Sequence, residues 1–239
     1  MAKSTFAGLP PGTQAFLRDL EKNNNREWFE ANKARYLKEV KAPVEAFAAA
    51  LSAGLARIAP AYAADPSRAV YRIYRDTRFS PDKTPYKTHA GALFFHSAVG
   101  KSEASGLYVE IAPRHVGIAG GVYMPGPERL RLIRVHLMEH HERFEKLIRQ
   151  RSLAALMGEL EGESLSRPPK GFPADHPAIE WIKRKQWYYW RELDPKLATS
   201  PQLVPEVLKR FEKMLPVVDF FNEPVLAHRK RLAPLILDL

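Results

Sequence analysis

The 239-residue chain contains no cysteine, which excludes disulfide bridges, thiolate catalysis and zinc bound through cysteine. No apolar run approaches the roughly 18 residues that a membrane-spanning helix needs. The first residues, MAKSTFAGLPPG, lack the long apolar stretch of a signal peptide. These absences predict a cytoplasmic protein that has no membrane partner.

What the chain does contain is typical of a globular protein. Apolar residues make up 45% and charged residues 27%, and this length suits one large domain or two small ones. The formal net charge is +10 and the isoelectric point is about 9.7. A basic surface of this kind is compatible with anionic partners.

The periodicity of apolar residues predicts an α+β fold, with an antiparallel sheet flanked by N-terminal and C-terminal helices in a single domain over residues 1–239. Residues 10–60 are expected to be helical, including a helix from Arg26 to about Val40, and residues 69–124 are expected to form the sheet. A long helix is expected over 127–150. Residues 176–232 should add a helix, a strand and two further helices, the second beginning after Pro216. The expected strands cover residues 70–75, 92–96, 107–112, 115–123 and 186–193.

The most informative stretch is residues 68–89, RAVYRIYRDTRFSPDKTPYKTH. Six cations stand against two anions, which leaves a net charge of +4. Tyr, Phe and Pro in the same stretch indicate an ordered segment, and a bound anion is one reason to gather cations in it. Arginine suits this use because its planar guanidinium can donate two parallel hydrogen bonds to a phosphate or carboxylate. The six cations are Arg68, Arg72, Arg75, Arg78, Lys83 and Lys87, and the anions are Asp76 and Asp82.

These residue types predict a site for a small anionic ligand that is phosphorylated or carboxylated. The basic side chains would hold the anion, the two aspartates would orient them, and His89 would act as a general base. The alternative is an exposed loop that Asp–Arg pairs make rigid. The predicted ligand-binding residues are Arg75, Arg78, Lys83, Tyr86 and Lys87, and the predicted catalytic residues are His89, Asp76 and Asp82.

The segment RIYRDTRFSPDKTPYKTH resembles the signature of a bacterial and fungal family, domain of unknown function 2461. Flanking residues agree with the resemblance, including Asn23, Asn24 and the run Arg26-Glu27-Trp28-Phe29. Further agreement is found in Tyr108-x-x-Ile111-x-Pro113 and in Gly171-Phe172-x-x-Asp175-His176-Pro177. The resemblance spans most of the chain. It implies one domain and marks residues 75–89 as the site, but it implies no particular chemistry.

A second anion site is predicted at Gly120 and Gly121, which precede the helix expected from Pro127, with Arg134 reaching in from that helix. The alternative is a bulge or hairpin that requires glycine at a positive φ angle.

His136-x-x-Glu139-His140 matches a zinc-binding pattern of inverted zincins. Solvated histidines on an amphipathic helix explain it better, so no metal site is predicted. Residues 183–191 mix cations with aromatics, as surfaces that bind nucleic acid do. The alternative is that alternate aromatics of this segment are buried in the core.

Three functions remain open at this point. The first is a protein that binds a small anion and that would catalyse phosphoryl or ester transfer if it is an enzyme. The second is a nucleic-acid-binding module built on the basic loop and residues 183–191. The third is a structural or partner-binding protein. The sequence indicates no particular cofactor.

Overall fold

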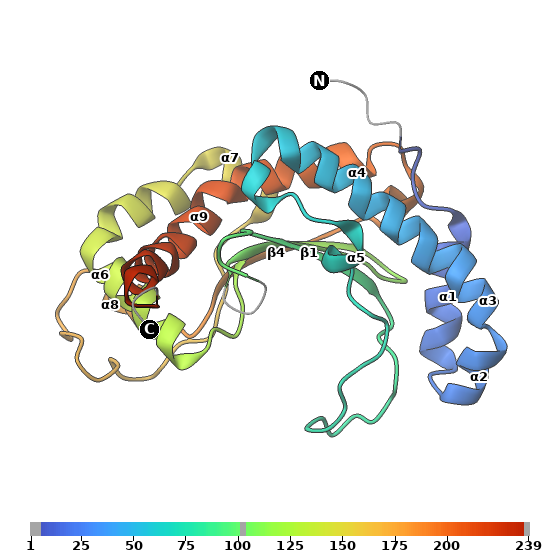
Figure 1. Ribbon diagram of the computed structural model, residues 1–239, viewed down its shortest axis with the longest axis horizontal. Coiled ribbons are helices and arrows are strands. Elements are labelled where there is room, and N and C mark those ends of the chain that lie inside the picture. Colours follow the sequence, from blue (N-terminus) through green and yellow to red (C-terminus); the bar gives the residue numbers. More distant parts are fainter. Residues whose placement is uncertain (1–5, 101–103, 237–239) are drawn as a thin grey trace. The chain divides into compact units, whose positions relative to one another are not determined.

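The computed structural model of the protein describes residues 6–100 and 104–236 (Figure 1). The chain divides into two compact units. Unit 1 comprises Met1–Phe94, Tyr108–Ile118 and Glu192–Lys209, and unit 2 comprises Phe95–Leu107, Ala119–Arg191 and Arg210–Leu239. A single domain over residues 1–239 stays a prediction.

A four-stranded antiparallel sheet has the strand order β1-β2-β3-β4, which confirms the α+β fold class. Residues 112–115 join the second strand to the third, a short connection that antiparallel pairing allows. Four of the five expected strands are present with ends within two residues of the prediction. They are β1 (Ala90–Phe95), β2 (Gly106–Ile111), β3 (Val116–Val122) and β4 (Trp187–Leu193).

Strand β2 shows how the sheet divides its side chains between two faces. Leu107, Val109 and Ile111 are each at most 1% exposed, because alternate residues of a strand point to the same side. Tyr108 and Glu110 lie on the opposite face and are partly exposed. This second face is where polar groups of unit 1 gather.

The helices of unit 1 begin with α1 (Pro11–Lys22), whose Phe16, Leu17 and Leu20 are fully buried. Asn25 caps the next helix by accepting a 2.9 Å hydrogen bond from the backbone N–H of Trp28. The helix expected from residue 26 to residue 40 is interrupted at Asn32, where the backbone leaves the helical region (φ −107°, ψ 11°). The resulting elements are α2 (Arg26–Ala31), α3 (Lys33–Tyr36), a π-helical turn (Leu37–Lys41), α4 (Ala42–Ile58) and α5 (Pro66–Ala69).

Unit 2 is built around aromatic side chains. Phe144 of α6 (Pro127–Ile148) lies 5.2 Å from Phe220 and 5.4 Å from Phe221, measured between ring centroids, and both belong to α9 (Leu203–Ile236). Trp187 packs on Phe221 at 5.6 Å. Two short helices complete the unit, α7 (Arg151–Met157) and α8 (Ile179–Ile182).

A second helix expectation is also wrong. Two helices were expected after residue 201, with a break at Pro216, but α9 continues through this proline. Proline removes one backbone hydrogen bond and crowds the preceding turn. The flanking Leu215, Val217 and Val218 are buried, and their packing keeps the chain helical.

Within residues 6–100 and 104–236, no helix combines the length and the apolar character that crossing a bilayer demands.

Candidate functional site

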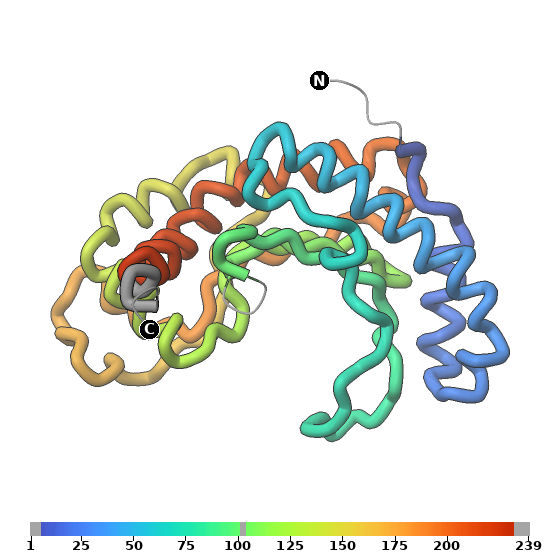
Figure 2. Tube along the Cα trace, viewed as in Figure 1, coloured from blue at the N-terminus to red at the C-terminus, as the bar shows by residue number. Residues whose placement is uncertain are grey.

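Residues 70–92 form an irregular antiparallel hairpin, which extends from the sheet on the side away from α4 (Figure 1). Figure 2 shows its two arms running beside each other. The arms meet at two bridges, Val70 with Ala92 and Tyr74 with Tyr86. Four residue steps separate these bridges on the outgoing arm and six on the returning arm. Because of this mismatch, the strand expected at residues 70–75 is present only as isolated bridges.

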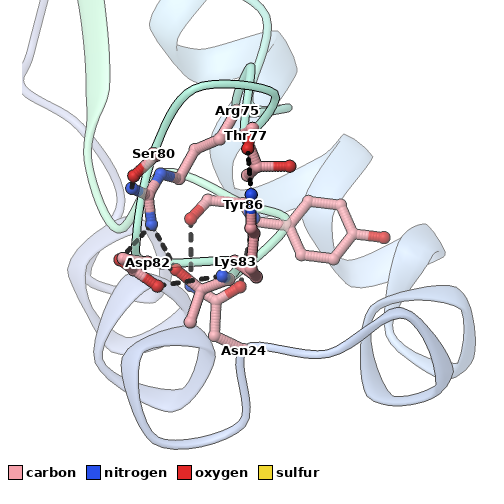
Figure 3. Close-up of polar contacts among 8 residues, drawn as sticks. Asn24, Arg75, Thr77, Ser80, Asp82, Lys83 and Tyr86 are labelled. Atoms are coloured by element: carbon pink, nitrogen blue, oxygen red, sulfur yellow. Dashed lines mark hydrogen bonds and ion pairs between the residues drawn. The ribbon is translucent and has the colours of Figure 1, made fainter.

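Asn24 fixes the returning arm of the hairpin. Its side-chain nitrogen donates to the carbonyl of Tyr86 at 2.9 Å, and its oxygen accepts from the Tyr86 N–H at 3.1 Å (Figure 3). The ring of Tyr86 stacks on Phe29 with centroids 4.1 Å apart. Tyr86 is 3% exposed, so this predicted ligand-binding residue holds the hairpin against α1 and α2.

The two aspartates each hold one arginine. Arg78 donates to Asp76 from Nε at 3.0 Å and from Nη2 at 2.8 Å. Arg75 pairs with Asp82 and with Thr84 (Figure 3 shows the pair with Asp82). The hydrogen bond from the Arg78 side chain, with one from its backbone N–H, lowers the pKa of Asp76 to about 2. The backbone N–H of Thr84, followed by Arg75, lowers the pKa of Asp82 to about 2.

The two lysines of the hairpin donate to backbone carbonyl groups. Lys83 reaches the carbonyl of Thr77 at 2.9 Å near the tip, as Figure 3 shows. Lys87 lies at the base, where its ammonium donates to the carbonyl of Arg72 at 3.1 Å and sits 4.8 Å from the ring centroid of Tyr71. The structure therefore spreads the predicted cations along the hairpin, and it places Lys87 beside the sheet.

His89 joins a group of polar side chains at the base of the hairpin, which we call the Glu110 cluster: His89, Tyr108, Glu110 and His115. The Tyr108 hydroxyl donates to Glu110 at 2.7 Å. The Nε2 atoms of His115 and His89 lie 3.0 Å and 3.6 Å from the Glu110 carboxylate. The side chain of Glu110 is 12% exposed, so a mostly buried carboxylate has three polar groups around it.

Burial shapes the protonation of this cluster. It lowers the pKa of His89, and the positive charge of Lys87 lowers it further while Glu110 opposes the shift. Burial, together with the negative charge of Glu110, raises the pKa of the Tyr108 phenol. Near neutral pH, Tyr108 is therefore a hydrogen-bond donor and His89 an uncharged imidazole that can accept a proton.

Tyr108, Glu110 and His115 were not predicted as site residues from the sequence. The available signal was Glu110, a charged residue inside the apolar strand GLYVEI, two positions from Tyr108 and therefore on the same face. The short connection between β2 and β3 places His115 opposite Glu110. The geometry also needs Gly91, because a Cβ atom there would lie 2.5 Å from the Tyr108 hydroxyl oxygen.

The predicted second anion site is built from residues that serve the fold. Gly121 has φ +135°, and a Cβ atom on it would lie 2.2 Å from the carbonyl oxygen of Trp187. Arg134 is buried, and it donates to the carbonyls of Ile182 at 2.8 Å and Arg184 at 3.2 Å, beyond the end of α8. Both glycines and Arg134 belong to unit 2, whereas the hairpin belongs to unit 1.

The zincin-like pattern lies in a groove of about 650 Å³ lined by α6 and α9. His136 Nε2 lies 3.2 Å from Glu223, which also accepts two hydrogen bonds from Arg143. Among the described residues, no three His, Asp or Glu side chains are grouped to hold a metal ion.

Residues 183–191 are used within unit 2. Lys183 pairs with Glu180 and Lys185 with Glu163, and the aromatic rings of this strand alternate as expected, with Trp187 and Tyr189 buried. The alternative interpretation, that alternate aromatics of this segment are buried in the core, is therefore correct for these two residues.

A family model for a conserved hypothetical protein, DUF2461, matches residues 12–220. The chain belongs to this family. The match includes the hairpin, Asn24 and the whole Glu110 cluster. Searches of curated proteins and of solved structures found no match.

Proposed function

We propose that this DUF2461 protein binds a small phosphorylated or carboxylated anion at the base of the hairpin, beside Lys87 and the Glu110 cluster. The observation that supports this most directly is the placement of Lys87. Its ammonium donates to the carbonyl of Arg72 and lies over the ring of Tyr71, and its charge lowers the pKa of the neighbouring His89.

The charge balance of the hairpin supports the same reading. Both aspartates are engaged by arginines of the hairpin itself, and the net charge of residues 68–89 remains +4. The Glu110 carboxylate faces donors from Tyr108 and His115, so these donors reduce its repulsion of an incoming anion.

Arg75 and Arg78 fit this proposal in a supporting role. Each faces an aspartate, which favours a rigid hairpin over direct contact with a ligand. Gly121 and Arg134 have structural uses in unit 2, and Gly120 belongs to the same unit, so the proposed anion site does not include these three residues. Nucleic-acid binding is less favoured, because cations and aromatics of residues 183–191 are used in the fold.

The test is calorimetric titration of the full chain with sulfate, pyrophosphate and citrate. Lys87→Met should weaken binding of the preferred anion by about tenfold, the scale of one charge-assisted contact. Lys22→Met, which removes the same charge from the exposed end of α1, should leave the affinity within about twofold. Equal affinities in the two variants, or no binding of any of the three anions by the wild-type protein, would contradict the proposal.

A further inference from the structure

The Glu110 cluster has the parts of a proton-transfer site. A carboxylate that is mostly buried in a strand is costly unless hydrogen bonds compensate it, and Glu110 receives them from Tyr108 and His115. An exposed polar residue would avoid the free-energy cost of burying this carboxylate. The arrangement therefore suggests a functional role for the Glu110 charge, which its hydrogen bonds hold in position.

His89 is the most exposed of the two histidines and the glutamate in the cluster. Its side chain is 33% exposed, compared with 12% for Glu110 and 23% for His115. Nε2 of His89 faces the carboxylate at 3.6 Å. With the ring proton on Nε2, the Nδ1 lone pair is the one available to take a proton, and the carboxylate stabilises the imidazolium that forms.

A cation lies next to this base. Lys87 precedes His89 by two residues, and it contacts Tyr71. The ring of Tyr71 in turn meets Tyr108 edge-on at a centroid distance of 6.2 Å. A base beside a fixed positive charge can activate water while the cation stabilises negative charge that develops on an ester oxygen. The Glu110 cluster contains no serine, threonine or cysteine, so this scheme uses water as the nucleophile.

We propose that His89 is the general base, and Glu110 its positioning residue, for hydrolysis of a small ester that carries a phosphate or carboxylate group. The inference rests on the proposed anion site, because Lys87 would hold the charged group. His89 takes one proton from water as the water oxygen bonds to the ester carbon or phosphorus. The bond to the leaving oxygen then breaks, and that oxygen receives the proton from His89, so the products are an acid and an alcohol.

The test uses the full chain with 4-nitrophenyl phosphate and 4-nitrophenyl succinate, and with uncharged 4-nitrophenyl acetate for comparison. The wild-type protein should hydrolyse at least one anionic ester with a higher kcat/KM than the acetate. His89→Gln should lower kcat by about 100-fold with little change in KM, which is the usual scale of general-base catalysis. His141→Gln, which changes a histidine outside the cluster, should leave kcat unchanged.

Glu110→Gln provides a second readout. Glu110 raises the pKa of His89, so its loss should move the acidic limb of the kcat/KM profile to lower pH. A change that only perturbed the fold would lower activity without moving this limb. An unmoved limb would overturn the role of Glu110, and an unchanged kcat in His89→Gln would overturn the role of the base.

The two proposals can fail separately. If Lys87→Met weakens sulfate binding but the wild-type protein releases no 4-nitrophenol from either anionic ester, the anion site stands and the hydrolytic inference is wrong. If His89→Gln abolishes hydrolysis while Lys87→Met changes neither KM nor sulfate binding, the base stands and the anion site is wrong.

Discussion

Replacing Asn24 by alanine should destabilise the protein more than its partly exposed position suggests. In the bridge between Tyr74 and Tyr86, the ladder hydrogen bonds are made by the neighbours, from Arg75 to Pro85 and from Lys87 to Ile73. The backbone N–H and C=O of Tyr86 therefore point outward, and the Asn24 amide satisfies both.

The magnitude follows from these two bonds. A net hydrogen bond contributes about 0.5–1.5 kcal/mol, and a buried group left without a partner costs about 1–3 kcal/mol. Because Tyr86 is 3% exposed, water replaces the lost amide poorly. We expect Asn24→Ala to lower the free energy of unfolding by about 2 kcal/mol, or Tm by about 4–8 °C for a chain of this size.

Urea denaturation followed by circular dichroism measures this loss. The neighbouring Asn23 is the matched control, because its side chain makes one exposed hydrogen bond, to the carbonyl of Asp19. Asn23→Ala should cost less than about 1 kcal/mol. Asn24→Asp, which keeps the acceptor and loses the donor, should fall between the two. Equal losses for Asn23→Ala and Asn24→Ala would refute the reasoning.

Three other predictions concern glycine, proline and histidine. Gly121→Ala should lower the free energy of unfolding by more than about 2 kcal/mol, because φ is +135° and the new Cβ would meet a carbonyl of β4. The control Gly126→Ala, with nothing within 4 Å of its Cβ, should be tolerated. Similar denaturation midpoints for the two variants would contradict this prediction. Pro216→Ala should stabilise the protein by about 1 kcal/mol or more, since it restores a helical N–H. The control is Pro205→Ala, in the first turn of α9, which should have little effect. A Pro216→Ala variant no more stable than this control would be evidence against this account. The pKa of His89 in the folded protein lies below its usual value of 6.5, so the unfolded state binds more protons just below that pH. Stability should therefore fall as the pH decreases below 6.5. Melting curves recorded over this pH range should show a smaller fall for His89→Gln than for the wild-type protein.

The sequence predicted the sheet well, because strand signals are local. Alternation and short connections located β1 to β4 within two residues. The failures occurred where packing overrides local preference. Pro216 predicts a helix end, yet the buried residues beside it keep α9 continuous. At Asn32, the backbone interrupts a helix that its apolar spacing predicts.

The candidate site was only partly visible in the sequence for a similar reason. A run of basic residues is easy to recognise along a chain, but the hairpin that carries it is not visible in the sequence, which predicts a regular strand at residues 70–75. Whether Arg75 faces a ligand or Asp82 depends on the path of the chain between them. Glu110 and His115 acquire their meaning only when β2 and β3 lie side by side, and no local pattern links them to His89.

The low pKa values of Asp76 and Asp82, about 2 in each case, have a practical consequence. Lysine and arginine do not titrate between pH 5 and 8 in ordinary surroundings, so the charge that the hairpin presents to an incoming ligand across that interval changes only through His89. Sulfate also keeps its charge there. Any change in its affinity over this interval would therefore report protonation of imidazole groups, and it would do so without a chemical label.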